Sequence, residues 1–277
     1  MNVRIIVDSS ADILAGIREK ILSVPVIVRF KDREFHDGVD LSYDELYKRM
    51  ESGMVPQTSQ ANPASFEEVY QKVKDRDETA VVITISSKLS GVFQSATMAL
   101  EGFRDRIRVV DSQNGSIGAG ILAQFAYEKA KEGMDHEAIA DLLEEEKKNV
   151  CLLGTLDSFR YLKRSGRISS ITAAAGDVLS IKPILTLKGG AITSIGKVRG
   201  TLKSYKALGS EILKAGVDFS RPFCLAYAGN SDEHLRGFKD ANPELALWDV
   251  ARIGTAVGSY LGPGALLTAF FRRPSKA

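Results

Sequence analysis

The chain has 277 residues, of which 44% are hydrophobic, and its formal net charge at pH 7 is +2. This length and composition predict a soluble globular protein of about two domains, on a prior of roughly 150 residues per domain. The two cysteines are too few for a secreted scaffold built on disulfides, and the near-zero net charge indicates no class of partner.

Two features of the chain bear on where it works. Cys151 and Cys224 each lie inside an apolar run, as buried free thiols do in a reducing compartment. The chain begins directly with a strand pattern and shows no signal-peptide region, so we expect a cytoplasmic protein. Residues 253–271 carry no charge, but four glycines and Pro263 interrupt them. We therefore interpret this stretch as a buried glycine-rich turn between apolar segments and predict no membrane span.

Strand-like and helical patterns alternate through the first half of the chain. Apolar runs predict strands near residues 3–7, 24–30, 80–86, 107–111 and 150–155. Helical periodicity appears between them, near residues 11–21, 43–52, 64–74, 89–102, 117–131 and 136–148. Asn62-Pro63 is a good helix start, with proline at the first helical position. This alternation predicts a parallel sheet with helices on its faces.

The second half has a different pattern. Pro183–Leu187, Gly189-Gly190 and Ala191–Ile195 predict a β-hairpin with a two-residue turn. A helix is predicted near 201–215, and strands near 222–228, 246–253 and 265–271. We therefore predict an α/β protein of two domains, with an N-terminal parallel-sheet domain over residues 1–150 and a C-terminal α+β domain over residues 151–277.

Small hydroxyl residues cluster directly after three of the predicted strands, and a fourth cluster precedes the helix at Asn62. In open α/β sheets, ligands bind at the carboxyl ends of the strands. Hydroxyls and helix N-termini that meet there suit an anionic head group. The four clusters are Asp8-Ser9-Ser10, Ser86-Ser87-Lys88-Leu89-Ser90-Gly91, Asp111-Ser112 and Gln57-Thr58-Ser59-Gln60.

Basic residues are concentrated between Arg160 and Lys206, where ten lysines and arginines accompany one acid, Asp177. Two explanations fit this stretch equally well. It can form a solvated basic face, or it can attract an anionic ligand or an acidic partner. The three histidines have no metal-ligand spacing, and no phosphate loop or nucleophile elbow is present. Gly118-x-Gly120-x-x-Ala123 follows a strand, but the acid of a dinucleotide site is missing, so we expect helix packing there and no cofactor.

Eight short motifs in this order resemble the DegV family of fatty-acid-binding proteins, across nearly the whole chain. The motifs are Asp8-Ser9-Ser10, Thr58-Ser59-Gln60, Ser86-Ser87-x-Leu89-Ser90-Gly91, Asp111-Ser112, Tyr161-Leu162-x-x-x-Gly166-Arg167-Ile168, Lys182-Pro183-Ile184-Leu185, Lys197-x-Arg199 and Gly262-Pro263-Gly264. The resemblance implies two α/β domains and a fatty acid whose carboxylate lies at their junction. Some members of that family carry the acyl group for a bacterial fatty acid kinase, whose separate subunit phosphorylates the carboxylate to an acyl phosphate.

The resemblance implies a binding protein that performs no chemistry by itself, with a long-chain fatty acid as its ligand and a kinase subunit as its partner. Hydroxyl groups would hold the carboxylate, and arginines would supply charge to it or to an incoming phosphate. Taken alone, each hydroxyl is better explained by helix capping, and surface solvation is the alternative explanation for each arginine. The implied ligand-binding residues are Thr58, Ser59, Ser87, Ser90, Gly91, Arg167, Arg199 and Tyr260.

Tyr260 is a departure from the family pattern, which commonly has histidine two residues before Gly-Pro-Gly. A tyrosine hydroxyl can donate one neutral hydrogen bond to a carboxylate, but it cannot become cationic near neutral pH as histidine does. We expect Tyr260 to point at the same anion as Ser90. The alternative is that Tyr260 packs against the second domain with its hydroxyl in solvent. The sequence leaves open whether a chain with tyrosine in place of this histidine supports phosphorylation of the fatty acid.

Two other classes of function remain alternatives. An enzyme acting on a small anionic substrate at the strand ends would need a base, for which Asp8 and Asp111 are the clear candidates. A short, polar pocket would favour that reading. A nucleic-acid-binding module would need aromatic residues among the basic ones, and only Tyr161 and Tyr205 lie there, so we expect no nucleic-acid partner.

Overall fold

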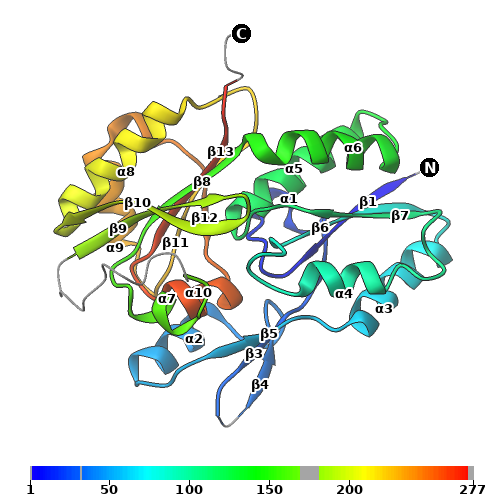
Figure 1. The fold of residues 1–277 in the computed structure, drawn as a ribbon, viewed down its shortest axis with the longest axis horizontal. Helices are drawn as coiled ribbons and strands as arrows, with labels where there is room; N and C mark the ends of the chain where they lie inside the picture. The colour runs from blue at the N-terminus through cyan, green and yellow to red at the C-terminus, as the bar shows by residue number, and fades with distance from the viewer. Residues whose placement is uncertain (1, 32, 169–180, 274–277) are drawn as a thin grey trace.

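The computed structural model describes residues 2–31, 33–168 and 181–273, and the strands among these residues form three sheets (Figure 1). The first sheet is parallel throughout. Its strands run in the order β2 (Leu22–Val24), β1 (Val3–Asp8), β6 (Thr79–Thr84) and β7 (Ile107–Asp111).

Helices cover both faces of this parallel sheet. Ile5 and Val7 point to one face, toward α5 (Ile117–Lys131) and α6 (His136–Glu146), while Ile6 points to the other, toward α3 (Pro63–Asp75) and α4 (Val92–Met98). Successive side chains of a strand alternate between faces, and both faces here are buried. The strands therefore have continuous apolar runs, as parallel sheets require.

The second sheet is mainly antiparallel and is built from Val150 onward. Its order is β10 (Ala191–Arg199), β9 (Ile181–Lys188), β8 (Val150–Thr155), β13 (Leu266–Phe271), β11 (Phe223–Tyr227) and β12 (Val250–Arg252), and only β11 and β12 pair in parallel. The helices α8 (Thr201–Ala215) and α9 (Glu233–Ala241) pack on one face. A 3-10 turn, Lys147–Asn149, leads into β8, and a second, Pro243–Leu245, follows α9.

Helix α5 joins the two sheets, because it packs on β1 of the first and on β13 and β11 of the second. Nine of its 15 residues are buried, from Ile117 to Ala126. A Cβ atom on Gly120 would lie 2.2 Å from the backbone oxygen of Asp12, so only glycine allows the start of α5 to approach the loop after β1. The Gly118-x-Gly120 motif thus has the packing role expected from the sequence.

The third sheet is small and antiparallel. Its strands run in the order β4 (Glu34–His36), β3 (Ile27–Arg29) and β5 (Gln57–Ser59). The remaining short helices are α1 (Ala15–Arg18), α2 (Tyr43–Glu51) and α7 (Arg160–Arg164). Helix α10 (Thr255–Leu261), from the far end of the chain, packs on α2, α7, β3 and β5. These contacts bring α10 together with segments more than 190 positions earlier in the sequence, β3, β5 and α2 (Figure 1).

The mixed α/β fold class is confirmed, and most predicted elements are present. The hairpin turns at Gly189-Gly190, both with positive φ, and its strands are longer than predicted. The predicted strand at 24–30 is in fact two strands in different sheets, because Pro25 cannot donate a ladder hydrogen bond between them. The predicted helix at 11–21 is also wrong over most of its length, since α1 covers only Ala15–Arg18.

The uncharged stretch 253–271 is a helix, a turn and a strand. Helix α10 ends at Leu261, Gly262 and Gly264 adopt positive φ in the turn, and β13 follows. Among the described residues, no helix is both long and apolar enough to cross a membrane. Cys151 and Cys224 are buried free thiols, as expected. The division into domains at residue 150 stays a prediction, although sheet membership changes at Val150.

Candidate functional site

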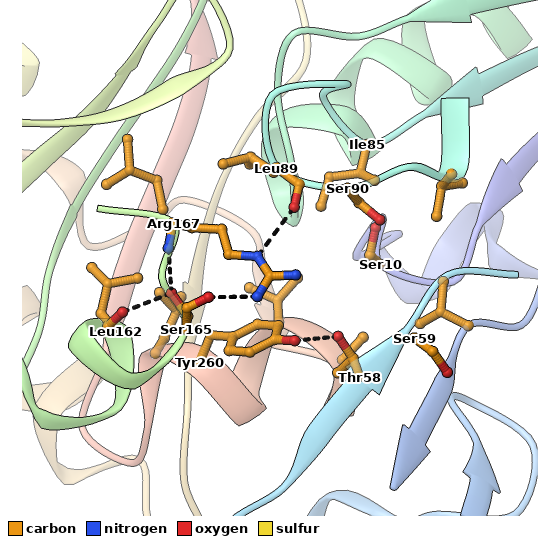
Figure 2. A pocket seen from close by; sticks show the side chains of 16 residues that line it. Ser10, Thr58, Ser59, Ile85, Leu89, Ser90, Leu162, Ser165, Arg167 and Tyr260 are labelled. Atoms are coloured by element: carbon orange, nitrogen blue, oxygen red, sulfur yellow. Dashed lines mark hydrogen bonds between the residues drawn. The ribbon is translucent and has the colours of Figure 1, made fainter. Parts of the chain in front are cut away.

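An apolar cavity of about 640 Å³ lies where the parallel sheet, the small sheet, α7 and α10 meet (Figure 2). Most of its lining is apolar, and its polar side chains are Ser10, Thr58, Ser59, Ser90, Ser165, Arg167 and Tyr260. Three of the four predicted hydroxyl clusters therefore contribute to this cavity, whereas neither residue of the cluster Asp111-Ser112 lines it.

A second apolar cavity, of about 530 Å³, lies beside the first. The two share the side chains of Ile85, Leu89, Ile192, Val257 and Leu261. The second extends between the loops of the parallel sheet and the face of the six-stranded sheet that carries Leu152, Leu185, Leu187 and Leu267. The arrangement is an elongated apolar space with polar groups at one end.

Thr58 and Tyr260 close the polar end from the small sheet and from α10. The Thr58 hydroxyl and the Tyr260 hydroxyl are hydrogen-bonded to each other, and either can be the donor. Adjacent residues of a strand point to opposite faces, so the Thr58 hydroxyl faces Tyr260 while the Ser59 hydroxyl is directed away from that pair (Figure 2). Tyr260 thus lines the cavity, and that its hydroxyl points at the same anion as Ser90 stays a prediction.

Ser10 and Ser90 enter the cavity from the loops that follow β1 and β6. The Ser10 hydroxyl donates to the buried Asp8 carboxylate, which also accepts from the backbone N–H of Ser10 and of Ile85. Asp8 therefore holds the two loops together, although burial raises the pKa of its carboxyl group. The Ser90 hydroxyl makes no hydrogen bond within the described part of the chain, so it is available to a ligand.

Arg167 spans the polar end (Figure 2). Its guanidinium donates from Nε to the Leu89 carbonyl oxygen at 3.4 Å and from Nη1 to the Ser165 carbonyl oxygen, and its carbon lies 5.2 Å from the centre of the Tyr260 ring. Two of its five N–H donors are used in this way. The remaining three can serve an anion, and stacking on the ring keeps the plane of the group in place.

Two buried carboxylates anchor the start of α10, which carries Val257 and Tyr260 into the cavity. Asp12 accepts from the Ser116 hydroxyl and, at 2.7 Å, from the Gly254 backbone N–H. Asp37 accepts from the backbone N–H and the hydroxyl of Thr255. Burial raises the pKa of Asp12 to about 7 and also raises that of Asp37. The position of Tyr260 therefore depends on contacts with residues more than 200 positions away.

Three of the predicted residues do not line the cavity. Ser87 is exposed, and its backbone N–H donates to Asp111 at 3.2 Å. Gly91 precedes α4, and a Cβ there would lie 1.9 Å from the side-chain oxygen of Gln60, so its space is already used. Arg199 is exposed at the end of β10. Thr58, Ser59, Ser90, Arg167 and Tyr260 do line it.

Asp8 and Asp111, the two candidate bases, both accept hydrogen bonds from neighbouring residues. Asp8 is fully buried with three hydrogen bonds, and Asp111 accepts from the backbone N–H groups of Ser87 and Gln113. Among the described residues, no three His, Cys, Asp or Glu side chains gather as a metal site would require.

Tyr161 lies beside the cavity, whereas Tyr205 is buried and hydrogen-bonded to His234 at 2.8 Å. The long apolar space favours a lipid over a small polar substrate.

Sequence reasoning left out several lining residues. Ser10 belongs to a strand-end cluster and could have been included by the same rule that selected Ser90. Ser165 precedes Gly166-Arg167 and has no signal of its own. The apolar lining residues Ile192, Val257 and Leu261 have no local signature, because any apolar residue of the core shares their pattern.

Residues 2–273 match the family described as "Uncharacterised protein, DegV family". The chain belongs to the DegV family. It is 30% identical to a fatty acid-binding protein of Thermotoga maritima, over 96% of this chain and 96% of the relative.

Solved structures of proteins described as fatty-acid-binding have the same fold. A fatty-acid-binding DegV protein of Thermus thermophilus superposes with a TM-score of 0.87 at 27% identity, covering 98% of this chain and all of its own. A stearic-acid-binding protein of Eubacterium ventriosum superposes with a TM-score of 0.83 at 25% identity, covering 98% of each chain. The two-domain fold of the DegV family is therefore the fold of this chain.

Proposed function

We propose that this DegV protein binds a long-chain fatty acid and carries it to a partner. The observation that carries the proposal is the elongated apolar space that ends at hydroxyl groups and one guanidinium. Relatives and structural neighbours described as fatty-acid-binding support the same ligand class.

The acyl chain would occupy the two connected apolar cavities. Burial of an alkyl chain contributes about 0.8 kcal/mol per methylene, so about 15 carbons give on the order of 10 kcal/mol before the costs of binding. The lining side chains Leu89, Ile192 and Leu261 offer no polar group that such a chain would leave unpaired.

The carboxylate would lie at the polar end, because an unpaired buried charge is very costly. Thr58, Tyr260 and Ser90 offer hydroxyl donors, and Arg167 offers charge. Arg199 and Ser87 lie outside the cavity and have no place in this version of the site. We further propose that the protein is non-enzymatic and cytoplasmic, and that it presents the carboxylate to a kinase subunit that forms the acyl phosphate.

Mass spectrometry of the purified protein tests the ligand. Denaturation in organic solvent should release one long-chain fatty acid per chain. If only small polar metabolites are released, and added fatty acid does not bind, the proposal is wrong.

Gly115→Val tests the path of the chain. A Cβ on Gly115 would lie 3.4 Å from Ile85, in ordinary contact, so the larger side chain is tolerated by the backbone and enters the second cavity. Each methylene that no longer fits should cost about 0.8 kcal/mol. A series of fatty acids should therefore show a loss that grows with length and vanishes for short chains. A loss equal at all lengths would contradict this path.

A further inference from the structure

The hydroxyl groups in the wall of the apolar cavity differ in where their protons go. The Ser90 hydroxyl makes no hydrogen bond within the described part of the chain. The hydroxyls of Thr58 and Tyr260 bond to each other, so one of their two protons is left for a ligand. The Ser10 hydroxyl instead donates its proton to the buried carboxylate of Asp8. Ser90 can therefore donate to a ligand, whereas Ser10 offers a ligand only the lone pairs of its oxygen.

The proton of Ser10 is held in place by the burial of its acceptor. Asp8 is 0% exposed, and its carboxylate accepts from the Ser10 hydroxyl, from the Ser10 backbone N–H and from the Ile85 backbone N–H. If the hydroxyl turned toward a ligand, a fully buried carboxylate would lose one of these three donors, which is costly. Ser10 itself is 4% exposed, and no described residue donates to its hydroxyl oxygen. Ser10 is thus a buried acceptor without a donor.

A simple fatty acid leaves this acceptor unmatched. An ionised carboxylate has acceptors only, and the methylene groups that follow it have no donor. A bound chain displaces water from the cavity, and a polar group left without a partner there costs free energy. A hydroxyl group on the acyl chain would supply the missing donor. We propose that Ser10 selects fatty acids that carry a hydroxyl group close to the carboxylate, and that it accepts a hydrogen bond from that hydroxyl.

The place of Ser10 fixes where on the chain this hydroxyl must be. Ser10 lines the first apolar cavity, which holds the polar end, and does not line the second. Figure 2 shows Ser10 in the same part of the wall as Ser90. With the carboxylate at the polar end, the carbons that pass Ser10 are those that follow the carboxyl carbon. The inference rests on the proposed function at this point, and it names 2-hydroxy and 3-hydroxy acids as the substrate class.

Isothermal titration calorimetry on the full chain tests this selection. The probes are palmitate, 2-hydroxypalmitate, 3-hydroxypalmitate and the matching 2-fluoro and 3-fluoro acids, in which fluorine replaces the hydroxyl but donates no hydrogen bond. The variant Ser10→Ala removes the acceptor. Ser9→Ala is the matched control, because Ser9 is the neighbouring serine, lines neither cavity and uses its hydroxyl to accept from the Val26 backbone N–H at 3.0 Å.

We expect the wild type to bind at least one of the two hydroxy acids about fivefold or more tightly than its fluoro counterpart, since only the hydroxyl can donate to Ser10. Ser10→Ala should lower the affinity for that hydroxy acid, relative to palmitate, by about tenfold, because the ligand hydroxyl then lacks a partner in an apolar cavity. Ser9→Ala should keep the wild-type ratio.

The inference is overturned if neither hydroxy acid binds the wild type more tightly than its fluoro counterpart, a comparison that needs no variant to fold. It is also overturned if Ser10→Ala weakens palmitate and the hydroxy acid equally, since Ser10 would then be a donor to the carboxylate. An equal change of the ratio in Ser9→Ala overturns it as well. In each of these cases palmitate still binds and the fatty acid site stands. If neither palmitate nor a hydroxy acid binds, the proposed function fails instead.

Discussion

Two polar regions lie next to each other in this protein and use their side chains differently. Behind the apolar cavity, the carboxylates of Asp8, Asp12 and Asp37 are buried, and each accepts from backbone N–H groups and from a hydroxyl. In its wall, Ser90 and Arg167 keep donors that no described residue uses. Donors that are hydrogen-bonded to a buried carboxylate therefore stabilise the fold. Donors that have no carboxylate partner can bind a ligand.

Asp8→Asn should show the largest effect, on stability. The amide cannot accept all three hydrogen bonds that the carboxylate accepts, so a buried donor at Ser10 or Ile85 loses its partner. We expect the free energy of unfolding, measured by urea titration, to fall by about 3 kcal/mol. Asp111→Asn is the control at the end of β7 in the same sheet, where the side chain is partly exposed, and should cost under about 1 kcal/mol. Equal losses in both variants would remove the distinction between the two regions.

Asp12 should make stability depend on pH. Its pKa is raised to about 7 in the folded chain from 3.8, so the native state keeps a proton that the unfolded chain releases. The contribution of Asp12 to stability therefore grows as the pH falls from about 7 toward 4. Asp37 adds to the rise in pKa, and Arg18 opposes it.

Asp12→Asn removes this proton equilibrium. Between about pH 7.5 and pH 5.5, the difference in unfolding free energy between wild type and variant should change by about 2 kcal/mol in favour of the wild type. Urea titrations at both pH values measure it. A difference that does not change with pH would show that Asp12 is ionised throughout this range.

Ser90→Ala should act on binding and not on stability, because no described residue uses the hydroxyl. We expect fatty acid affinity to fall by about 2 kcal/mol, since a carboxylate in a dry site loses a donor. Ser87→Ala, three residues earlier and outside the cavity, should leave affinity as it is. Calorimetry on the two variants decides which serine belongs to the site.

Tyr260→Phe should show the smallest effect, a loss of about 1 kcal/mol in fatty acid affinity, because Thr58 and Arg167 remain as donors. Tyr260→His should make affinity vary between about pH 6 and pH 8, where imidazole takes up a proton and the phenol does not. Unchanged affinity in Tyr260→Phe would mean that the hydroxyl only positions Thr58.

Local chemistry made a large part of this protein predictable. Apolar runs buried on both faces indicated the parallel sheet, Gly189-Gly190 indicated the hairpin, and hydroxyls after β1 and β6 indicated the end of the sheet where a site would lie. These features are predictable because each depends on residues within a few positions of one another.

The choice among the candidate residues was decided by tertiary structure. Thr58 and Ser59 are adjacent and chemically similar, yet the pleat of β5 turns only the Thr58 hydroxyl to Tyr260. Arg167 and Arg199 are equally basic in sequence, but only Arg167 lies in the cavity wall. Which hydroxyl or charge faces a ligand depends on register and on contacts between distant segments, such as Asp12 with Gly254. No local pattern of residues encodes those contacts, because they form only when the two sheets pack together through α5.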